Sequence, residues 1–236
     1  MEPPSRNISK SATLRMSLKR GYAKAVISHA KKSKLDVKSL FDELRTLRRN
    51  AKAHKRLILR LRKNPSVVSS NLLSNHGISI VYREPITQET KHSGETLFLE
   101  DALIFTLVEV TISRMGRSMG IVRASFCLHA IERLIERTDY EIGPEFAAII
   151  DREAAHILKE IKDDNEIAHN SDFFISALKQ GVWAGSLDDT APDEEWRVRK
   201  TSALVPTFSV RTFLSPDEMT PTVWLDWQKD PTITRS

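Results

Sequence analysis

The spacing of apolar residues changes along this chain of 236 residues, and the change limits the folds open to it. Residues 11–63 place apolar side chains at three- and four-residue steps, as on one face of a helix. β-Branched and aromatic residues dominate 78–82 and 103–112, which is typical of strands. Helical spacing returns at 124–137 and 145–162, and strand-like runs follow. Because helices and strands come in groups and do not alternate regularly, we predict an α+β fold rather than a doubly wound sheet.

The N-terminal apolar stripes predict a helical hairpin. One helix covers 11–33, and a second covers 36–63 and ends at Asn64-Pro65, with Lys31–Lys34 near the turn. We therefore divide the chain into a basic helical hairpin, residues 1–65, and an α+β body, residues 66–236. In the body we expect a mainly antiparallel sheet packed on two or three helices.

The rest of the body is assigned from local composition. A helix over 99–107 is the alternative to the strand there, because Glu100-Asp101-Ala102 could cap one. We predict loops at 87–95, 114–120, 163–170 and 188–195, a short helix at 171–179, and strands at 182–184, 196–205, 207–214 and 223–227.

Charge divides the chain at the same place. Residues 1–65 hold 19 Lys and Arg against 4 Asp and Glu, a net charge of +15. Residues 66–236 hold 17 against 27, a net charge of −10. An asymmetry of this size predicts that the basic part meets a polyanion.

The basic residues of the predicted hairpin are candidates for contact with an RNA or DNA backbone. Each helix has one aromatic residue, Tyr22 or Phe41, so base stacking is not indicated and little sequence reading is expected. The alternatives are a protein partner or the acidic body of the chain itself. A membrane partner is not expected, because the hairpin lacks Trp. The candidate nucleic-acid-binding residues are Lys19, Arg20, Lys24, Arg45, Arg48, Arg49, Lys52, Lys55, Arg56 and Arg60.

A second constellation lies in the helix predicted at 124–137. His129, Arg133 and Arg137 are spaced i, i+4 and i+8, which places them on one helix face. Two arginines can bind a phosphate and stabilise developing negative charge, while a histidine acts as general acid or base. A metal-independent ribonuclease needs these roles. The alternative is a solvated face held by ion pairs with Glu132 and Glu136.

This His-x-x-x-Arg-x-x-x-Arg helix, followed by the strand 209–214, resembles small α+β ribonuclease toxins. The resemblance implies that Arg211 and Thr212 lie across the sheet from His129, so Arg211 joins the candidate catalytic residues. The competing hypothesis is a non-enzymatic adaptor that binds a protein partner through its basic arm or its acidic body.

Other sites receive less support. The sequence has no phosphate-binding loop and no His-x-x-x-His or paired Cys, so no cofactor and no metal are expected. His156 and His169 flank an acidic stretch that is typical of a polar loop. Cys127 is expected to be a buried, unreactive thiol. The chain lacks an apolar run of spanning length and a signal-like N-terminus, and we expect a cytoplasmic protein.

Overall fold

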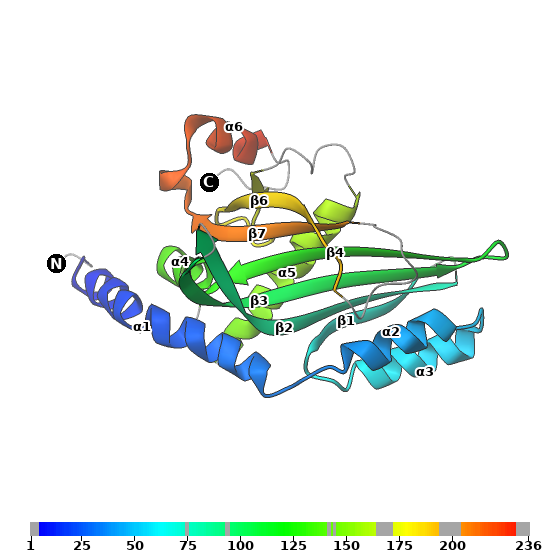
Figure 1. The fold of residues 1–236 in the computed structure, drawn as a ribbon. Coiled ribbons are helices and arrows are strands. Elements are labelled where there is room, and N and C mark those ends of the chain that lie inside the picture. Colours follow the sequence, from blue (N-terminus) through cyan, green and yellow to red (C-terminus); the bar gives the residue numbers. More distant parts are fainter. Residues whose placement is uncertain are drawn as a thin grey trace.

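A computed structural model describes residues 5–73, 76–92, 95–140, 143, 145–163, 172–193 and 204–229. The elements in these ranges confirm the α+β class (Figure 1). The helices are α1 (Ser5–Lys31), α2 (Val37–Thr46), α3 (Ala51–Leu61), α4 (Leu128–Arg137), α5 (Phe146–Asp163) and α6 (Pro221–Lys229), with a 3-10 turn, η3, at Pro216–Glu218. The strands are β1 (Val67–Leu73), β2 (Gly77–His92), β3 (Glu95–Ile112), β4 (Arg117–Cys127), β5 (Phe173–Ile175), β6 (Val182–Thr190) and β7 (Val205–Leu214).

One curved, seven-stranded sheet organises the molecule, in the order β1-β2-β3-β4-β7-β6-β5. Neighbouring strands are antiparallel, except that β4 and β7 run parallel. That parallel contact is short: only Arg123–Phe126 of β4 pair with Thr207–Val210 of β7. β2 and β3 are the longest strands, with 16 and 18 residues, and together they form the extended hairpin seen in Figure 1.

Both faces of the sheet are covered by helices, and β3 shows how the sequence achieves this. Leu103, Phe105 and Leu107 contact α1, α4 and α5, whereas Val108, Val110 and Ile112 contact α2 and α3. Successive side chains of a strand point to opposite faces. A strand buried on both faces therefore shows a nearly continuous apolar run, as 102–112 does.

The face covered by α1, α4 and α5 holds the larger core. Ile27 of α1, Ile131 of α4 and Ile157 of α5 are all buried there. A buried carboxylate, Glu153 of α5, accepts hydrogen bonds from Ser176 Oγ at 2.8 Å, Ala177 N at 2.8 Å and Trp183 Nε1 at 2.9 Å. Three donors offset the cost of burying this group and fix α5 to the β5–β6 turn and to β6.

The N-terminal hairpin predicted over 1–65 is corrected in two respects. Its two arms do not pack on each other, because they lie on opposite faces of the sheet, and the single helix expected over 36–63 is two helices. Leu47 is extended, with φ −59° and ψ 124°, and ends α2. Asn50 begins α3 by accepting hydrogen bonds from Lys52 N at 3.0 Å and Ala53 N at 3.3 Å. The short segment 47–50 turns the chain, so α2 and α3 both lie on one face of the sheet while α1 lies on the other with α4.

Other sequence assignments also change. Residues 124–127 are the end of β4, because β3 pairs with all four of them and β7 pairs with 124–126, and the helix begins only at Leu128. The alternative helix over 99–107 is wrong, since this stretch is in β3. Residues 87–92 and 95 belong to the β2–β3 hairpin, 117–120 belong to β4, 188–190 to β6, and 173–175 form β5 where a helix was expected. β1 was not anticipated.

The final strand prediction, 223–227, is also wrong, since these residues lie in α6. Pro221 stands at the start of this helix, where its missing N–H costs nothing, and Thr220 Oγ1 accepts from Val223 N at 3.5 Å. Local capping therefore outweighs the β-propensity of Val and Trp. The strand expected over 207–214 matches β7, whereas most of the strand predicted over 196–205 and nearly all of the polar segment 163–170 lie outside the described residues.

Candidate nucleic-acid interface

The helices α2 and α3 present their polar sides to solvent. Leu40, Phe41 and Leu44 of α2 are buried against the sheet, and so are Leu57 and Ile58 of α3. With the apolar stripes facing inward, the charged residues between them point outward. Asp36 Oδ1 caps α2 by accepting from Ser39 N at 2.9 Å, so both helices begin at a defined residue.

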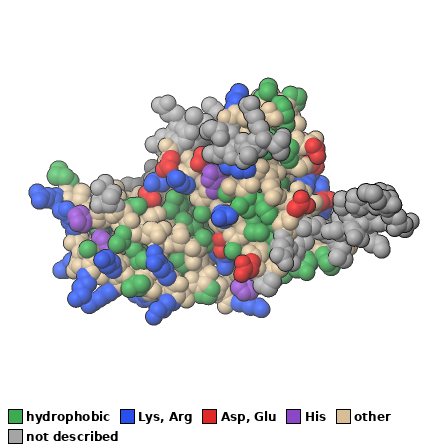
Figure 2. Space-filling model, turned by 180° about the vertical axis from the view of Figure 1, so that it is seen from behind, with side chains coloured by type: hydrophobic (Ala, Val, Ile, Leu, Met, Phe, Trp, Pro, Cys, Tyr) green, Lys and Arg blue, Asp and Glu red, His purple; other side chains and the backbone are tan. Residues whose placement is uncertain are grey.

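Five of the predicted nucleic-acid-binding residues form one exposed group on the α2–α3 connection and the outer side of α3. We call Arg48, Arg49, Lys52, Lys55 and Arg56 the basic surface; all are exposed. Lys52 and Arg56 are four residues apart, so they share one helix face. Figure 2 shows Lys and Arg side chains gathered over the end of the molecule that α2 and α3 form.

The connection that carries Arg48 and Arg49 is held in place from inside. His54 is only 1% exposed, and its Nε2 lies 2.8 Å from the carbonyl oxygen of Arg48. The same carbonyl accepts from Asn50 N at 2.7 Å. Two hydrogen bonds to one carbonyl fix the backbone, so the guanidinium groups of Arg48 and Arg49 extend from an ordered base.

Two other residues predicted to bind nucleic acid form ion pairs within the α2–α3 region. Arg45 pairs with Asp42 at 2.8 Å, and Arg60 pairs with Glu43 across the two helices. Among the described residues, no ion pair involves any member of the basic surface. Asp42 and Glu43 thus pair with Arg45 and Arg60, and the positive charge of the basic surface is not balanced by these carboxylates.

Three cations of α1, in contrast, form ion pairs with the body of the chain. Lys19 Nζ donates to Glu136 Oε2 at 2.8 Å, Arg20 lies 3.7 Å from Glu132, and Lys31 lies 3.2 Å from Asp101. All three carboxylates belong to the body of the chain. Lys24 is exposed on the outer side of α1. The structure therefore separates Lys19 and Arg20 from the basic surface, both in position and in charge balance.

The predicted catalytic group on α4 takes part in the same network. His129 is exposed, and its Nε2 lies 3.4 Å from Arg133 Nε. Arg133 also donates to Glu136 Oε2 at 2.8 Å, so Lys19 and Arg133 share one carboxylate. Burial alone would raise the pKa of Glu136, but hydrogen bonds from Lys19 and Arg133 outweigh it and hold the pKa below its ordinary value.

Arg137 contacts β7 and Arg211 lies within it, and no hydrogen bond between described residues joins either of them to His129. Arg137 donates to Thr212 Oγ1 at 3.3 Å, to the carbonyl of Phe213 and to Glu218, and burial lowers the pKa of its guanidinium. Arg211 is the extra residue of a β-bulge, because Ala184 and Gly185 of β6 pair with Thr212 and Val210. Its Nη2 lies 3.5 Å from Ser186 Oγ. Arg137 thus joins α4 to the end of β7.

Cys127 is the last residue of β4 and the N-cap of α4, and its Sγ accepts from Ala130 N at 3.4 Å. Burial raises the pKa of this thiol to about 11, so it is protonated at neutral pH. Cys127 is half-buried, not fully buried as expected, and its lack of reactivity stays a prediction. In the described part of the chain no three His, Cys, Asp or Glu residues are grouped so that they could hold a metal ion.

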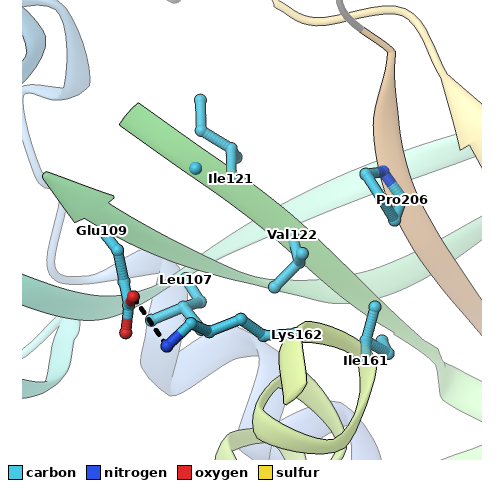
Figure 3. Close-up of a pocket in the computed structure, with 8 residues that line it drawn as sticks. Leu107, Glu109, Ile121, Val122, Ile161, Lys162 and Pro206 are labelled. Atoms are coloured by element: carbon cyan, nitrogen blue, oxygen red, sulfur yellow. Dashed lines mark ion pairs between the residues drawn. The ribbon is translucent and has the colours of Figure 1, made fainter. Parts of the chain in front are cut away.

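A small pocket opens where β7 diverges from β4 (Figure 3). Its volume is about 200 Å³, and its walls are mostly apolar, with Leu107, Val122, Ile161 and Pro206 among them. Lys162 Nζ and Glu109 Oε2 form an ion pair of 2.7 Å at its side. Ligand pockets commonly span about 300–1,000 Å³, so this pocket is small for a binding site.

Two residues next to the basic surface were not anticipated as functional. Arg114 and Arg117, in the turn between β3 and β4, are exposed, and Arg117 Nη2 donates to the carbonyl of Leu47. This contact brings the β3–β4 turn beside Arg48. The sequence signal was present, since both arginines flank Met115-Gly116, but the segment was predicted only as a connecting loop.

None of the described helices is long and apolar enough to cross a membrane. Comparison with protein-family models, with curated proteins and with solved structures finds no match to this chain.

Proposed function

We propose that this protein binds the phosphate backbone of nucleic acid through the basic surface. The observation that carries the proposal is the contrast in charge balance within the N-terminal region. Lys19, Arg20 and Lys31 each face a carboxylate of the body, whereas the basic surface is exposed and has no ion pair among the described residues. A group of uncompensated cations on one ordered surface suits a ligand with closely spaced phosphates.

The energetics of such binding follow from counterion release. Each phosphate that a Lys or Arg neutralises frees condensed cations from the nucleic acid, and the logarithm of the association constant falls with the logarithm of salt concentration by about 0.9 per contact on duplex DNA. Five contacts would give a slope of about −4.5. The positive end of the α3 dipole lies beside Arg49 and Lys52, with no acidic residue in the first turn to oppose it.

Backbone contact without sequence reading is the mode that this surface favours. Phe41, the aromatic residue of α2, is fully buried, and the exposed members of the basic surface are cations. Cations on flexible side chains contact phosphates of any sequence, while aromatic platforms are what binds unstacked bases.

RNA cleavage stays a separate prediction, for which the candidate residues are His129, Arg133, Arg137 and Arg211. The proximity of His129 and Arg133 supports it, while the ties of Arg137 to β7 and Glu218 favour a structural role for that residue. If the protein is a ribonuclease, replacement of His129 by Ala should abolish cleavage of single-stranded RNA and leave the affinity for duplex DNA unchanged. Unchanged cleavage would exclude His129 as the general acid or base.

A matched pair of variants tests the binding proposal. Lys52 and Arg56 lie in the basic surface on α3, and Arg152 and Lys159 are exposed on α5. Each pair holds one Lys and one Arg, so K52Q/R56Q and R152Q/K159Q remove the same charge. We expect K52Q/R56Q to weaken binding to a generic duplex at least tenfold at low salt, with R152Q/K159Q close to wild type in fluorescence anisotropy. Equal weakening by both would show that only net charge matters and would refute the assignment of the surface.

The second candidate function is recognition of an acidic protein. Leu59, on the outer side of α3 between Arg56 and Arg60, is 60% exposed and would suit an apolar contact within a charged interface. In that case Leu59→Gln should weaken partner binding, while duplex affinity should be absent in every variant.

A further inference from the structure

The turn between β3 and β4 has a single, well-supported shape. Ser113 N donates to the carbonyl of Gly116 at 2.9 Å, and Met115 N donates to Ser113 Oγ at 3.1 Å. Gly116 has a φ of 145°, which a residue with a side chain rarely adopts. Ile112 and Arg117 pair directly on either side. The side chains of Arg114 and Met115 are therefore presented from a fixed backbone.

This turn belongs to the same end of the molecule as the basic surface. Arg117 Nη2 donates to the carbonyl of Leu47, next to Arg48. Figure 1 shows the β3–β4 turn and the α2–α3 connection together at one end of the fold, with the turn projecting beyond the sheet. Arg114 and Arg117 therefore continue the positive charge of Arg48 and Arg49 along that end.

Met115, at the tip of this turn, is 97% exposed. A single exposed apolar side chain is ordinary on a protein surface. The position of Met115 is not: it stands between two exposed arginines, on a projecting hairpin, beside further cations. An apolar side chain flanked by cations at the tip of an element is the chemistry that proteins use to wedge apart base steps in the minor groove of DNA.

We infer that the β3–β4 turn is a second contact to duplex DNA, in which Met115 inserts against a base step in the minor groove and Arg114 contacts the adjoining phosphates. This inference rests on the proposed function, because the basic surface supplies the affinity that brings the turn to the duplex. Arg117 acts as a positioning residue, since its bond to Leu47 fixes the turn relative to Arg48 and Arg49.

The geometry favours a duplex over a membrane. One methionine buries little apolar area, whereas interfacial helices bind membranes through a whole apolar face. A base step needs only one wedge, and pyrimidine–purine steps such as TA unstack most readily. The turn should therefore prefer duplexes with TA steps by a small factor, although the basic surface alone has no preference.

The test uses the full-length chain and a short duplex whose adenines at several TA steps are replaced by 2-aminopurine, a base that brightens on unstacking. We expect saturating wild-type protein to raise the fluorescence. Met115→Gln should abolish this rise and weaken binding about tenfold. Leu225→Gln is the matched control, because Leu225 is also exposed, at 52%, but lies on α6. It should behave as wild type.

The outcomes separate the two proposals. If wild-type protein binds the duplex with a steep salt dependence but gives no rise, and Met115→Gln binds equally well, the inference is wrong while the proposed function stands. If the protein binds RNA but no duplex DNA, the inference is wrong and the proposed function stands, and if it binds neither, both are wrong. Sedimentation with anionic vesicles that depends on Met115, without a 2-aminopurine signal, would assign the turn to a membrane surface instead and overturn the inference.

Discussion

Helix α1 and the α2–α3 pair both have a high density of Lys and Arg. They differ in the charged groups that surround those side chains. α1 lies on the face of the sheet shared with α4, where Glu132 pairs with Arg20 and Glu136 pairs with Lys19. α2 and α3 lie on the other face, and their outer side meets no carboxylate of the body among the described ion pairs. The comparison shows that net charge counted along a chain does not reveal which cations a ligand can reach.

Removal of residues 1–65 is the most disruptive way to test this contrast. If they form an independent hairpin, the remaining chain should fold. In the structure, however, Ala23 and Ile27 cover one face of the sheet, and Phe41 and Leu44 cover the other. We expect the chain of residues 66–236 to lose cooperative thermal unfolding and to aggregate, because both apolar faces become exposed. A monomeric fragment with a sharp melting transition would show that the two parts are separate domains.

A single lysine on each helix sharpens the comparison. Lys19→Gln should lower the free energy of unfolding by about 1 kcal/mol, since Lys19 and Glu136 are both largely shielded, and should leave duplex affinity within about twofold. Lys52→Gln should do the reverse, with stability unchanged and affinity reduced several-fold. Urea denaturation and fluorescence anisotropy give the two readings. Reduced affinity in Lys19→Gln would indicate that α1 contacts the ligand.

The pH dependence of stability tests the α1–α4 network more finely. The pKa of Glu136 is lower in the folded protein than in the unfolded chain, so its contribution is present above the unfolded pKa and is lost as the pH falls through the folded pKa. Between pH 7 and pH 3, Glu136→Gln should therefore lose less stability than wild type. The measurement is urea denaturation at both pH values. An identical loss in the two proteins would mean that Lys19 and Arg133 do not stabilise the carboxylate.

The smallest expected loss of duplex affinity concerns the start of α3. Asn50→Ala removes the cap of Lys52 N and Ala53 N and should cost about 1 kcal/mol. Because Asn50 follows Arg49, duplex affinity should also fall slightly. Asp36→Ala, which removes the cap of α2, is the control: it should cost a similar free energy and leave affinity unchanged.

Much of the fold could be predicted because the hydrophobic period is a local property. The helices α4 and α5 and the strands β2, β3 and β7 were all found at least in part from their apolar spacing. The break at 47–50 was missed because leucines continue on both sides of it, and only Asn50 marks the new helix. Cys127 was assigned to a helix because the pairing of β4 with β3 and β7 depends on residues distant in sequence.

The sequence could predict which residues belong to the candidate site, but it could not predict how they are arranged in space. Arg48, Arg49, Lys52, Lys55 and Arg56 were named from charge alone. The neutralisation of Lys19 by Glu136 joins residues more than a hundred positions apart, so no local pattern could reveal it. Arg114 and Met115 were passed over because a turn between strands looks the same in sequence whether it is buried, exposed or beside another basic segment.

The salt dependence of duplex binding tests the central claim most directly. For wild type, a plot of the logarithm of the association constant against the logarithm of salt concentration should have a slope of about −4.5. K52Q/R56Q should make this slope shallower by about 2. R152Q/K159Q should leave the slope unchanged. A slope near zero for wild type, or an equal reduction in both variants, would contradict the account.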